Sequence, residues 1–387
     1  MTRVTPRDAP YVHTYYDVCP FSPSQRYLAV TRLPFEDRVA VLGDEAQICV
    51  IDLREQSIRT VGTTRSWGFQ TGALLNWGAT DRRLYTNDVV DGEARCVRID
   101  LASGERTVFA GPMYHIAPDE SCVIGFPLEL LDATQPGYGV PCADPLRPRR
   151  LPPGAAEDEG VWRTDLATGE RTLLLSLAEA AACLPRPLPR EDGTFYFWHS
   201  KFNRQGTGIM QVLRCLFPDG SGGRNPATFA MDPDGGNLCF LPFDSPWNAG
   251  GGHPNWHGDG ERLVRNVEEE GGIRYCQVNR DGTGRRLLGD TLEGGGHPSV
   301  EPSGRWLITD YLAGNGGQEV VLRLADLHAQ EQRGLCSLPT IDQRSLKQRP
   351  LRLDGHPVWS RDYLKVCFQA APEGVRQLFV ADLSGVI

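Results

Sequence analysis

Short runs of alternating apolar and polar residues recur along most of the chain, and turn sequences separate them. A typical unit has an apolar run, a second run ending near an Asp-Leu pair, and a short polar run, as in LLNWGATDRRLYTND followed by ARCVRIDLASGERTVFA. Alternation with a period of two predicts half-buried β-strands. The Gly-containing turns between the runs predict hairpins, because glycine tolerates the positive φ that a tight reversal needs.

Seven such units follow one another from about residue 11 to the end of the chain. A single small β-meander cannot bury both of its faces, whereas a closed ring of meanders buries every face and leaves only short edges. The sequence therefore predicts an all-β fold, a seven-bladed β-propeller that forms a single domain over residues 1–387. The last unit is one strand short, and we expect N-terminal residues around 13–16 to complete it.

Two stretches interrupt this rhythm. Residues 127–160 are rich in proline and are inserted between strands of the third unit. Because proline cannot donate a ladder hydrogen bond, we expect this insertion to lie outside the blades, near an opening of the ring or in solvent. Residues 176–183, SLAEAAAC, have the composition of a short helix.

One phrase returns in four successive units: HSKFNRQG, HPNWHGDG, HPSVEPSG and HPVWSRDY, at spacings of 54, 44 and 59 residues. It places His199, His253, His297 and His356 at one position of the repeat. The innermost strand of every propeller blade begins beside the central axis. We therefore expect the four imidazoles to converge at one end of the central channel.

Several neutral imidazoles beside a carboxylate or amide oxygen suit Mn, Fe, Ni or Zn. Asp354 lies two residues before His356, and residues at that spacing in an extended chain face the same way. We predict a divalent metal held by His199, His297, His356 and Asp354. The alternative interpretation is that His-Pro is a structural repeat in which the imidazole caps a neighbouring strand.

Composition narrows the class of partner and the compartment. The net charge is −9 and no basic cluster carries interleaved aromatic residues, which argues against binding of nucleic acid. No apolar run is long enough to cross a membrane, and the N-terminus lacks the pattern of a secretory signal. The 11 cysteines are scattered singly, which favours a reducing cytoplasm.

An acidic ligand remains compatible with the negative net charge, because one local cationic pocket can bind a carboxylate. Lys201 shares a strand face with His199, and Arg214 and Arg224 follow in the same unit. Gln70, in SWGFQTGALLNW, precedes the inner strand of the second unit and offers an amide beside aromatic side chains. We predict that Gln70 and Lys201 bind substrate; packing in the core is the alternative role for the aromatic residues around Gln70.

The phrases GGGHPSVEPSGRWLITDYL, DGHPVWSRDYLKVCFQ and HSKFNRQGTGIMQVL resemble the oligogalacturonate lyase family, which belongs with the TolB-like seven-bladed propellers. The resemblance is strongest in the last four units. It implies β-elimination on an acidic oligosaccharide with a divalent metal, usually manganese, and Ni, Fe, Zn and Ca are alternatives. It also implies that His297 and His356 bind the metal, that His253 is the catalytic base, and that Arg214 or Arg224 is the catalytic arginine.

One departure from the family pattern lies just before the last His-Pro. The chain reads RPLRLDGHP, so that Asp354 stands where the family has a histidine and Gln348 lies only roughly where it has a glutamine. We predict a carbohydrate-active lyase that cleaves a uronate-containing oligosaccharide by metal-assisted β-elimination. The alternatives are a glycoside hydrolase acting on an acidic or rhamnose-containing oligosaccharide and a noncatalytic interaction propeller. Nothing in the sequence indicates an oligomeric state.

Overall fold

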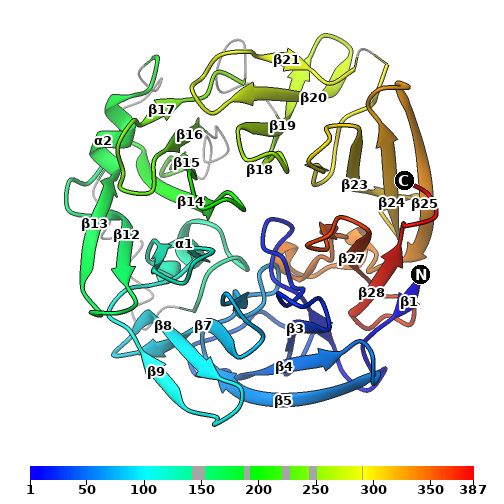
Figure 1. Cartoon of the computed structure of the whole chain (residues 1–387), viewed down its shortest axis with the longest axis horizontal. Helices are drawn as coiled ribbons and strands as arrows, with labels where there is room; N and C mark the ends of the chain where they lie inside the picture. The colour runs from blue at the N-terminus through cyan, green and yellow to red at the C-terminus, as the bar shows by residue number, and fades with distance from the viewer. Residues whose placement is uncertain (142–152, 187–191, 220–226, 244–250, 290) are drawn as a thin grey trace.

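The structure is a computed structural model that describes residues 1–141, 153–186, 192–219, 227–243, 251–289 and 291–387. Seven four-stranded antiparallel sheets stand around a central axis as the blades of a propeller (Figure 1). The predicted all-β, seven-bladed β-propeller is therefore confirmed.

Strands that are consecutive in the sequence are neighbours in each of the first six blades, from the axis outward. The first three blades consist of β2 (Tyr11–Val12), β3 (Tyr27–Arg32), β4 (Ala46–Asp52) and β5 (Ser57–Thr64); β6 (Asn76–Trp77), β7 (Arg83–Val90), β8 (Glu93–Asp100) and β9 (Arg106–Val108); and β10 (His115–Ile116), β11 (Cys122–Gly125), β12 (Gly160–Asp165) and β13 (Arg171–Ser176). The next three consist of β14 (Thr194–Phe202), β15 (Ile209–Leu216), β16 (Ala227–Met231) and β17 (Cys239–Phe240); β18 (Gly251–Trp256), β19 (Arg262–Glu269), β20 (Gly272–Asn279) and β21 (Arg286–Leu287); and β22 (Ser299–Val300), β23 (Trp306–Ala313), β24 (Glu319–Asp326) and β25 (Glu331–Pro339).

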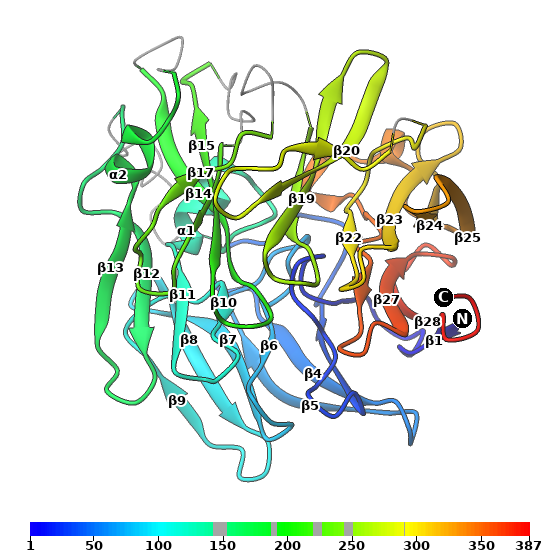
Figure 2. The ribbon, with the colours of Figure 1, turned by 45° about the horizontal axis from the view of Figure 1, so that its top comes forward.

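The seventh blade joins the two ends of the chain. It contains β26 (Val358–Trp359), β27 (Lys365–Ala370), β28 (Gln377–Asp382) and, as its outer strand, β1 (Thr2–Arg3). Thr2 pairs with Val380 and Arg3 with Phe379, and the two termini lie close together in both views (Figure 1 and Figure 2). The prediction that an N-terminal strand completes this blade is right, but its position around residues 13–16 is wrong. Residues 13–17 instead follow β2 toward the channel.

The hydrophobic core lies between neighbouring blades, as the ring closure requires. Val264 and Tyr275 of the fifth blade pack in one cluster with Leu307 and Ala325 of the sixth. Likewise, Ile308 and Leu322 of the sixth blade pack with Val366 and Phe368 of the seventh. Each sheet thus buries its two faces against the sheets beside it, which rigidly fixes the inner strands around the axis.

The insertion of the third blade contains the helix α1 (Leu128–Thr134). Its Leu128 and Leu131 are buried in a cluster with Trp198, and the helix contacts β8 and β14. Residues 127–141 and 153–159 contribute no strand to the blades, β12 begins at Gly160, and the apolar side chains of α1 pack on the ring. Residues 142–152 of this insertion fall outside the described residues.

Three further helical segments lie in the described residues. The helix predicted over residues 176–183 is confirmed as α2 (Leu177–Ala182), and Ser176 and Glu179 cap its start reciprocally. Two 3₁₀ turns, η2 (Gln343–Ser345) and η3 (Arg349–Leu351), lie between β25 and β26. In the described residues no helix combines the length and the apolar character that a membrane span needs.

Candidate metal centre

Three of the four repeated histidines form one row of rings in contact, one pair tilted and the other edge to face. The ring centroids of His253 and His297 are 4.2 Å apart, and those of His297 and His356 are 4.4 Å apart. The expected convergence at the axis is thus found for these three residues. These residues occupy equivalent positions in successive repeats, and the closed ring of blades brings equivalent positions close together at the axis.

The tyrosines of the N-terminal segment lie among these rings. Tyr15 is 4.4 Å from His356 and 5.6 Å from His199 between ring centroids. Tyr16 is 4.8 Å from His297 and 5.8 Å from His199. His199 therefore lies against the same tyrosines as His297 and His356, although it lies outside their row.

The histidines leave the regular path of their inner strands. His199, His253 and His356 have φ of 55°, 56° and 45°, and register shifts interrupt the pairing of β14 and β18 around the first two. Such left-handed conformations are unusual for residues other than glycine, and they persist where the surrounding structure enforces them. Strained backbone of this kind clusters at functional sites, so it supports a functional interpretation of the repeat.

Every one of the four rings is held at Nδ1 by a hydrogen-bond partner. The partners are Asp17 Oδ2 for His199 at 2.7 Å, the main-chain oxygen of Gly296 for His253 at 2.8 Å, Asp310 Oδ1 for His297 at 2.8 Å, and Gln369 Nε2 for His356 at 2.9 Å. For His199, His253 and His297 the partner is an acceptor, which places the ring proton on Nδ1 and leaves the lone pair on Nε2, whereas the amide nitrogen of Gln369 donates to Nδ1 of His356. Metal-binding histidines are commonly oriented in this way by a carboxylate or carbonyl.

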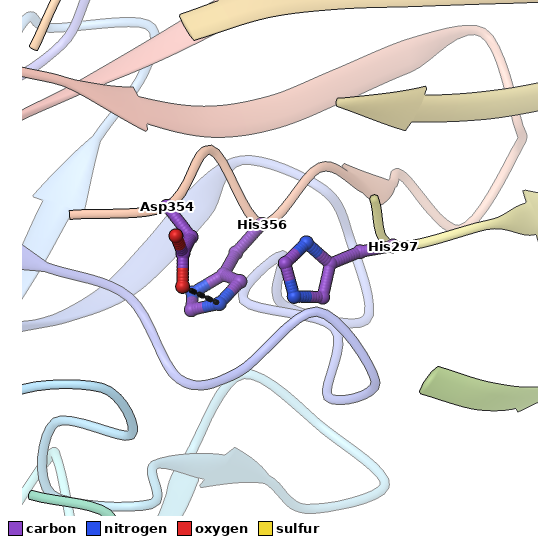
Figure 3. Close-up of side chains that lie close together, drawn as sticks. All are labelled: His297, Asp354 and His356. Carbon is purple, nitrogen blue, oxygen red and sulfur yellow. Dashed lines mark ion pairs between the residues drawn. The ribbon is translucent and has the colours of Figure 1, made fainter. Parts of the chain in front are cut away.

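His297, Asp354 and His356 offer ligand atoms that all lie within 4.8 Å of one another (Figure 3). Metal–ligand bonds are about 2 Å long, so ligand atoms on one ion are separated by at most about 4 Å, and small movements would bring these three onto an ion. Within the described residues Nε2 of His356 has no hydrogen-bond partner although it is fully buried. The donor set of two imidazoles and one carboxylate therefore fits a divalent metal such as Mn or Fe.

Burial keeps the imidazoles of His199, His253 and His356 neutral. It lowers the pKa of His253 and of His356 well below the usual value, and the neighbouring His297 lowers both further. Burial also lowers the pKa of His199 to about 4, despite the opposing effect of Asp17. The neutral form is the one that binds a metal or accepts a proton.

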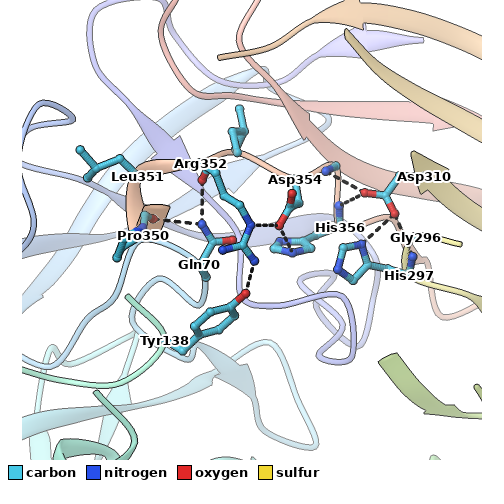
Figure 4. A network of polar contacts seen from close by, with 12 residues as sticks. Gln70, Tyr138, Gly296, His297, Asp310, Pro350, Leu351, Arg352, Asp354 and His356 are labelled. Carbon is cyan, nitrogen blue, oxygen red and sulfur yellow. Dashed lines mark hydrogen bonds and ion pairs between the residues drawn. The ribbon is translucent and has the colours of Figure 1, made fainter. Parts of the chain in front are cut away.

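Arg352 and Gln70 form a polar network behind Asp354 (Figure 4). Arg352 Nε donates to Asp354 Oδ2 at 2.8 Å, and its Nη2 donates to the hydroxyl of Tyr138. Gln70 Nε2 donates to the main-chain oxygens of Pro350 at 3.1 Å and Arg352 at 2.7 Å. The amide of Gln70, predicted to bind substrate, is thus engaged in holding the segment that carries Asp354.

Lys201 is engaged in a similar way. Its Nζ lies 3.1 Å from Asp17 Oδ2, which also accepts from the hydroxyl of Tyr114 at 3.0 Å, and it donates to the main-chain oxygen of Pro254 at 2.8 Å. Lys201 and His199 both contact Asp17, although the register shift at His199 interrupts the alternation along β14 on which the period-two argument depends. The amine is only 1% exposed, so its contacts are to protein groups.

The two candidate arginines differ in what the structure describes. Arg214, on β15, donates from Nη1 to Gln135 Oε1 at 2.7 Å. Burial is the largest cause of the lowered pKa of His199 and of His253, and the positive charge of Arg214 makes a smaller contribution in the same direction. Arg214 therefore lies near both imidazoles. Arg224 falls outside the described residues.

A separate cavity of about 430 Å³ lies at the far ends of the inner strands. Tyr16, Asp17 and Lys201 line it, but none of the four repeated histidines does. The indole nitrogens of Trp77, Trp256 and Trp359 around it donate to main-chain oxygens of Pro20, Lys201 and Ser299. Because these polar groups already serve the fold, the histidine cluster and not this cavity is the candidate site.

Sequence reasoning missed three residues that orient the imidazoles: Asp17, Asp310 and Gln369. Asp310 and Gln369 share a repeat position, because each lies 13 residues after the histidine that it contacts, on the second strand of its blade. The dense polar and aromatic phrase HTYYD at residues 13–17 is the one signal that points to the N-terminal part of the site.

Comparison with solved structures supports the resemblance noted in the sequence. The chain is similar to an oligogalacturonate lyase in complex with manganese, with a TM-score of 0.68 and 17% identity over 98% of this chain and 92% of that chain. It is similar to an oligogalacturonate lyase from Vibrio parahaemolyticus, with a TM-score of 0.66 and 14% identity over 98% of this chain and 93% of that chain. No family profile and no curated protein sequence matches the chain. At these identities the likeness shows a shared fold.

Proposed function

We propose that this protein is a carbohydrate-active lyase that cleaves a uronate-containing oligosaccharide by metal-assisted β-elimination. One observation carries the proposal: a ligand cluster of His297, Asp354 and His356 lies directly beside a neutral His253. The shared fold with oligogalacturonate lyases, one of which is described with manganese, agrees with it.

His253 is the residue placed to act as a base. Its Nδ1 donates to the main-chain oxygen of Gly296, so its lone pair lies on Nε2. It is also the most exposed of the four repeated histidines, whereas the other three are at most 4% exposed. A base that accepts the C5 proton of a uronate must reach the sugar, and His253 meets this requirement best.

His297, Asp354 and His356 would hold the metal. A divalent ion at this place supplies positive charge next to the uronate carboxylate, which acidifies the adjacent C5 proton. As His253 takes that proton, a C4–C5 double bond forms and the bond from C4 to the glycosidic oxygen breaks, and the leaving oxygen takes up a proton. Arg214 adds positive charge on the side of His199 and His253.

Two carboxylates beside the cluster, those of Asp17 and Asp310, are unsuited to the acid role in hydrolysis. A glycoside hydrolase needs a protonated carboxyl group whose pKa is raised. Burial by itself would raise the pKa of Asp17 and of Asp310. Lys201 and His199 nevertheless hold the pKa of Asp17 far below its usual value, and His297 lowers the pKa of Asp310. Both carboxyl groups are therefore ionised and cannot act as the acid.

The test compares metal binding and product formation in three single variants. His297→Ala should lose most of its Mn²⁺ affinity, since the remaining ligands cannot complete the coordination. His253→Ala should keep its metal affinity but lose about 10²–10⁴-fold in rate, the usual contribution of a general base. The rate is followed by the ultraviolet absorbance of the unsaturated product on acidic oligosaccharides.

His328→Ala serves as the matched control. His328 is exposed at the turn after β24, away from the channel, so its removal should change neither metal affinity nor rate. Wild-type activity in His253→Ala would refute the catalytic assignment. Release of reducing ends without ultraviolet absorbance would show a hydrolase, and a wild-type protein that neither binds metal nor cleaves would show a noncatalytic propeller.

A further inference from the structure

Asp310 contacts both chain segments that carry the metal-ligand histidines. It belongs to β23 in the sixth blade and is 3% exposed. Its Oδ1 accepts from the main-chain nitrogen of His297 at 2.9 Å and from Nδ1 of the same residue at 2.8 Å. Its Oδ2 accepts from the main-chain nitrogens of Gly355 at 2.8 Å and His356 at 3.1 Å, just before the seventh blade (Figure 4).

From this arrangement we propose that Asp310 is a positioning residue for the metal centre, which sets the distance between His297 and His356 and holds the ring of His297 in the tautomer that presents a lone pair on Nε2. The inference rests on the proposed metal site, but it does not depend on which reaction the site catalyses. Four hydrogen bonds to one buried carboxylate bind two blades together at the point where they supply ligands.

Close packing against Asp310 also accounts for the glycine directly before each of these two histidines. A Cβ added at Gly355 would lie 2.9 Å from Asp310 Oδ2 and 2.7 Å from Val320 Cγ1. A Cβ added at Gly296 would collide with the main-chain oxygen of Asp310, and Gly296 also has a φ of 61°. Glycine in the phrases GGGHP and DGHP therefore makes room for close approach to Asp310.

Replacing Asp310 by Asn would keep the shape of the side chain but remove one of its two hydrogen-bond acceptors. Both oxygens of the carboxylate accept hydrogen bonds, whereas an amide has one acceptor oxygen and one NH₂ donor. If the amide oxygen keeps the nitrogens of Gly355 and His356, the NH₂ group faces His297. The ring then has to accept at Nδ1 and carry its proton on Nε2, which is the wrong form for binding a metal there.

The experiment uses the full-length protein and its Asp310→Asn variant. Calorimetric titration with Mn²⁺ should show about 10–100-fold weaker binding in the variant, the usual effect of losing a partner that orients a ligand. Asp326→Asn is the matched control, because Asp326 pairs with Arg305 at the other end of the sixth blade and should leave affinity unchanged. Unchanged affinity in Asp310→Asn would overturn the inference.

A second measurement does not require the variant to fold. Imidazole ¹H–¹⁵N correlation spectra of the metal-free wild-type protein, with His297 assigned through its loss in His297→Gln, should show the proton on Nδ1. A proton on Nε2 of His297 would overturn the inference. If the wild-type protein fails to bind Mn²⁺, the proposed function fails, whereas this spectrum still decides the tautomer that Asp310 imposes.

Discussion

Substituting Asp17 by Asn would remove the buried negative charge at the centre of the channel while keeping its shape. Asp17 Oδ2 lies 2.7 Å from His199 Nδ1 and 3.1 Å from Lys201 Nζ, and the side chains of Asp17 and Lys201 are almost completely buried. The variant would therefore leave the ammonium group of Lys201 without an anionic partner in the interior. Breaking a buried pair in this way is strongly destabilising.

The size of the effect follows from two limits. The lost attraction over 3.1 Å amounts to about 5 kcal/mol at an effective dielectric constant of about 20. Lys201 can avoid part of this cost by losing its proton, because burial already lowers its pKa to about 8 against the opposing effect of Asp17. At pH 6, removing the proton from an amine with a pKa of about 8 costs about 3 kcal/mol, which corresponds to two pH units. The variant can always follow this route, so its loss of stability is limited to about 3 kcal/mol.

The same reasoning gives the pH dependence. Without Asp17, the pKa of Lys201 in the folded variant is lower than in the folded wild type. Below about pH 8, Lys201 is therefore protonated in the folded wild type but neutral in the folded variant. The loss of stability should therefore shrink as the pH rises through 8, because above it the amine is neutral in both folded proteins. We expect a difference of about 3 kcal/mol at pH 6 and about 1 kcal/mol at pH 9, the latter from weakened hydrogen bonds.

Urea unfolding of the wild type and of Asp17→Asn at pH 6 and pH 9 measures both numbers. The double variant Asp17→Asn, Lys201→Met is the control, since without the amine the difference between the two pH values should disappear. A loss below about 1 kcal/mol at pH 6, or the same loss at both pH values, would refute the reasoning.

Two further predictions concern the N-terminal part of the chain. Burial lowers the pKa of His13 to about 4, below the value near 6.5 of an unfolded chain. The stability that neutral His13 contributes is therefore fully present above pH 6.5 and is lost as the pH falls toward 4. Urea unfolding should show that the wild type loses stability between pH 7 and pH 4.5, and that His13→Phe loses up to about 3 kcal/mol less over the same pH interval. Deleting residues 1–5 removes β1 and the bonds that Val4 and Thr5 make to β28, and thermal and urea unfolding should show a loss of about 2–4 kcal/mol. The control Arg3→Ala removes only a partly exposed ion pair with Glu373 and should cost less than about 1 kcal/mol; equal losses in both variants would show that β1 does not close the ring.

Local patterns in the sequence were sufficient for the architecture and for part of the site. Period-two alternation with glycine turns, repeated seven times, leaves a closed ring as the arrangement that buries every sheet face. Ring closure then converts equal repeat positions into neighbours, which is why His253, His297 and His356 could be grouped without a structure. Asp354 could be added because it lies two residues from His356 along an extended segment.

The remaining features of the site were decided by tertiary structure, because they depend on contacts between segments that are far apart in the chain. Asp17 meets His199 across 182 residues, and Arg352 meets Tyr138 across 214 residues. Asp310 contacts both ligand segments only because the sixth and seventh blades lie side by side. Periodicity records which face of a strand is buried, but not which polar side chain from another segment satisfies a buried imidazole. That choice depends on packing around the whole ring, so the tautomers of the histidines, the strained backbone that turns them to the axis, and the strand that closes the last blade became apparent only in the folded protein.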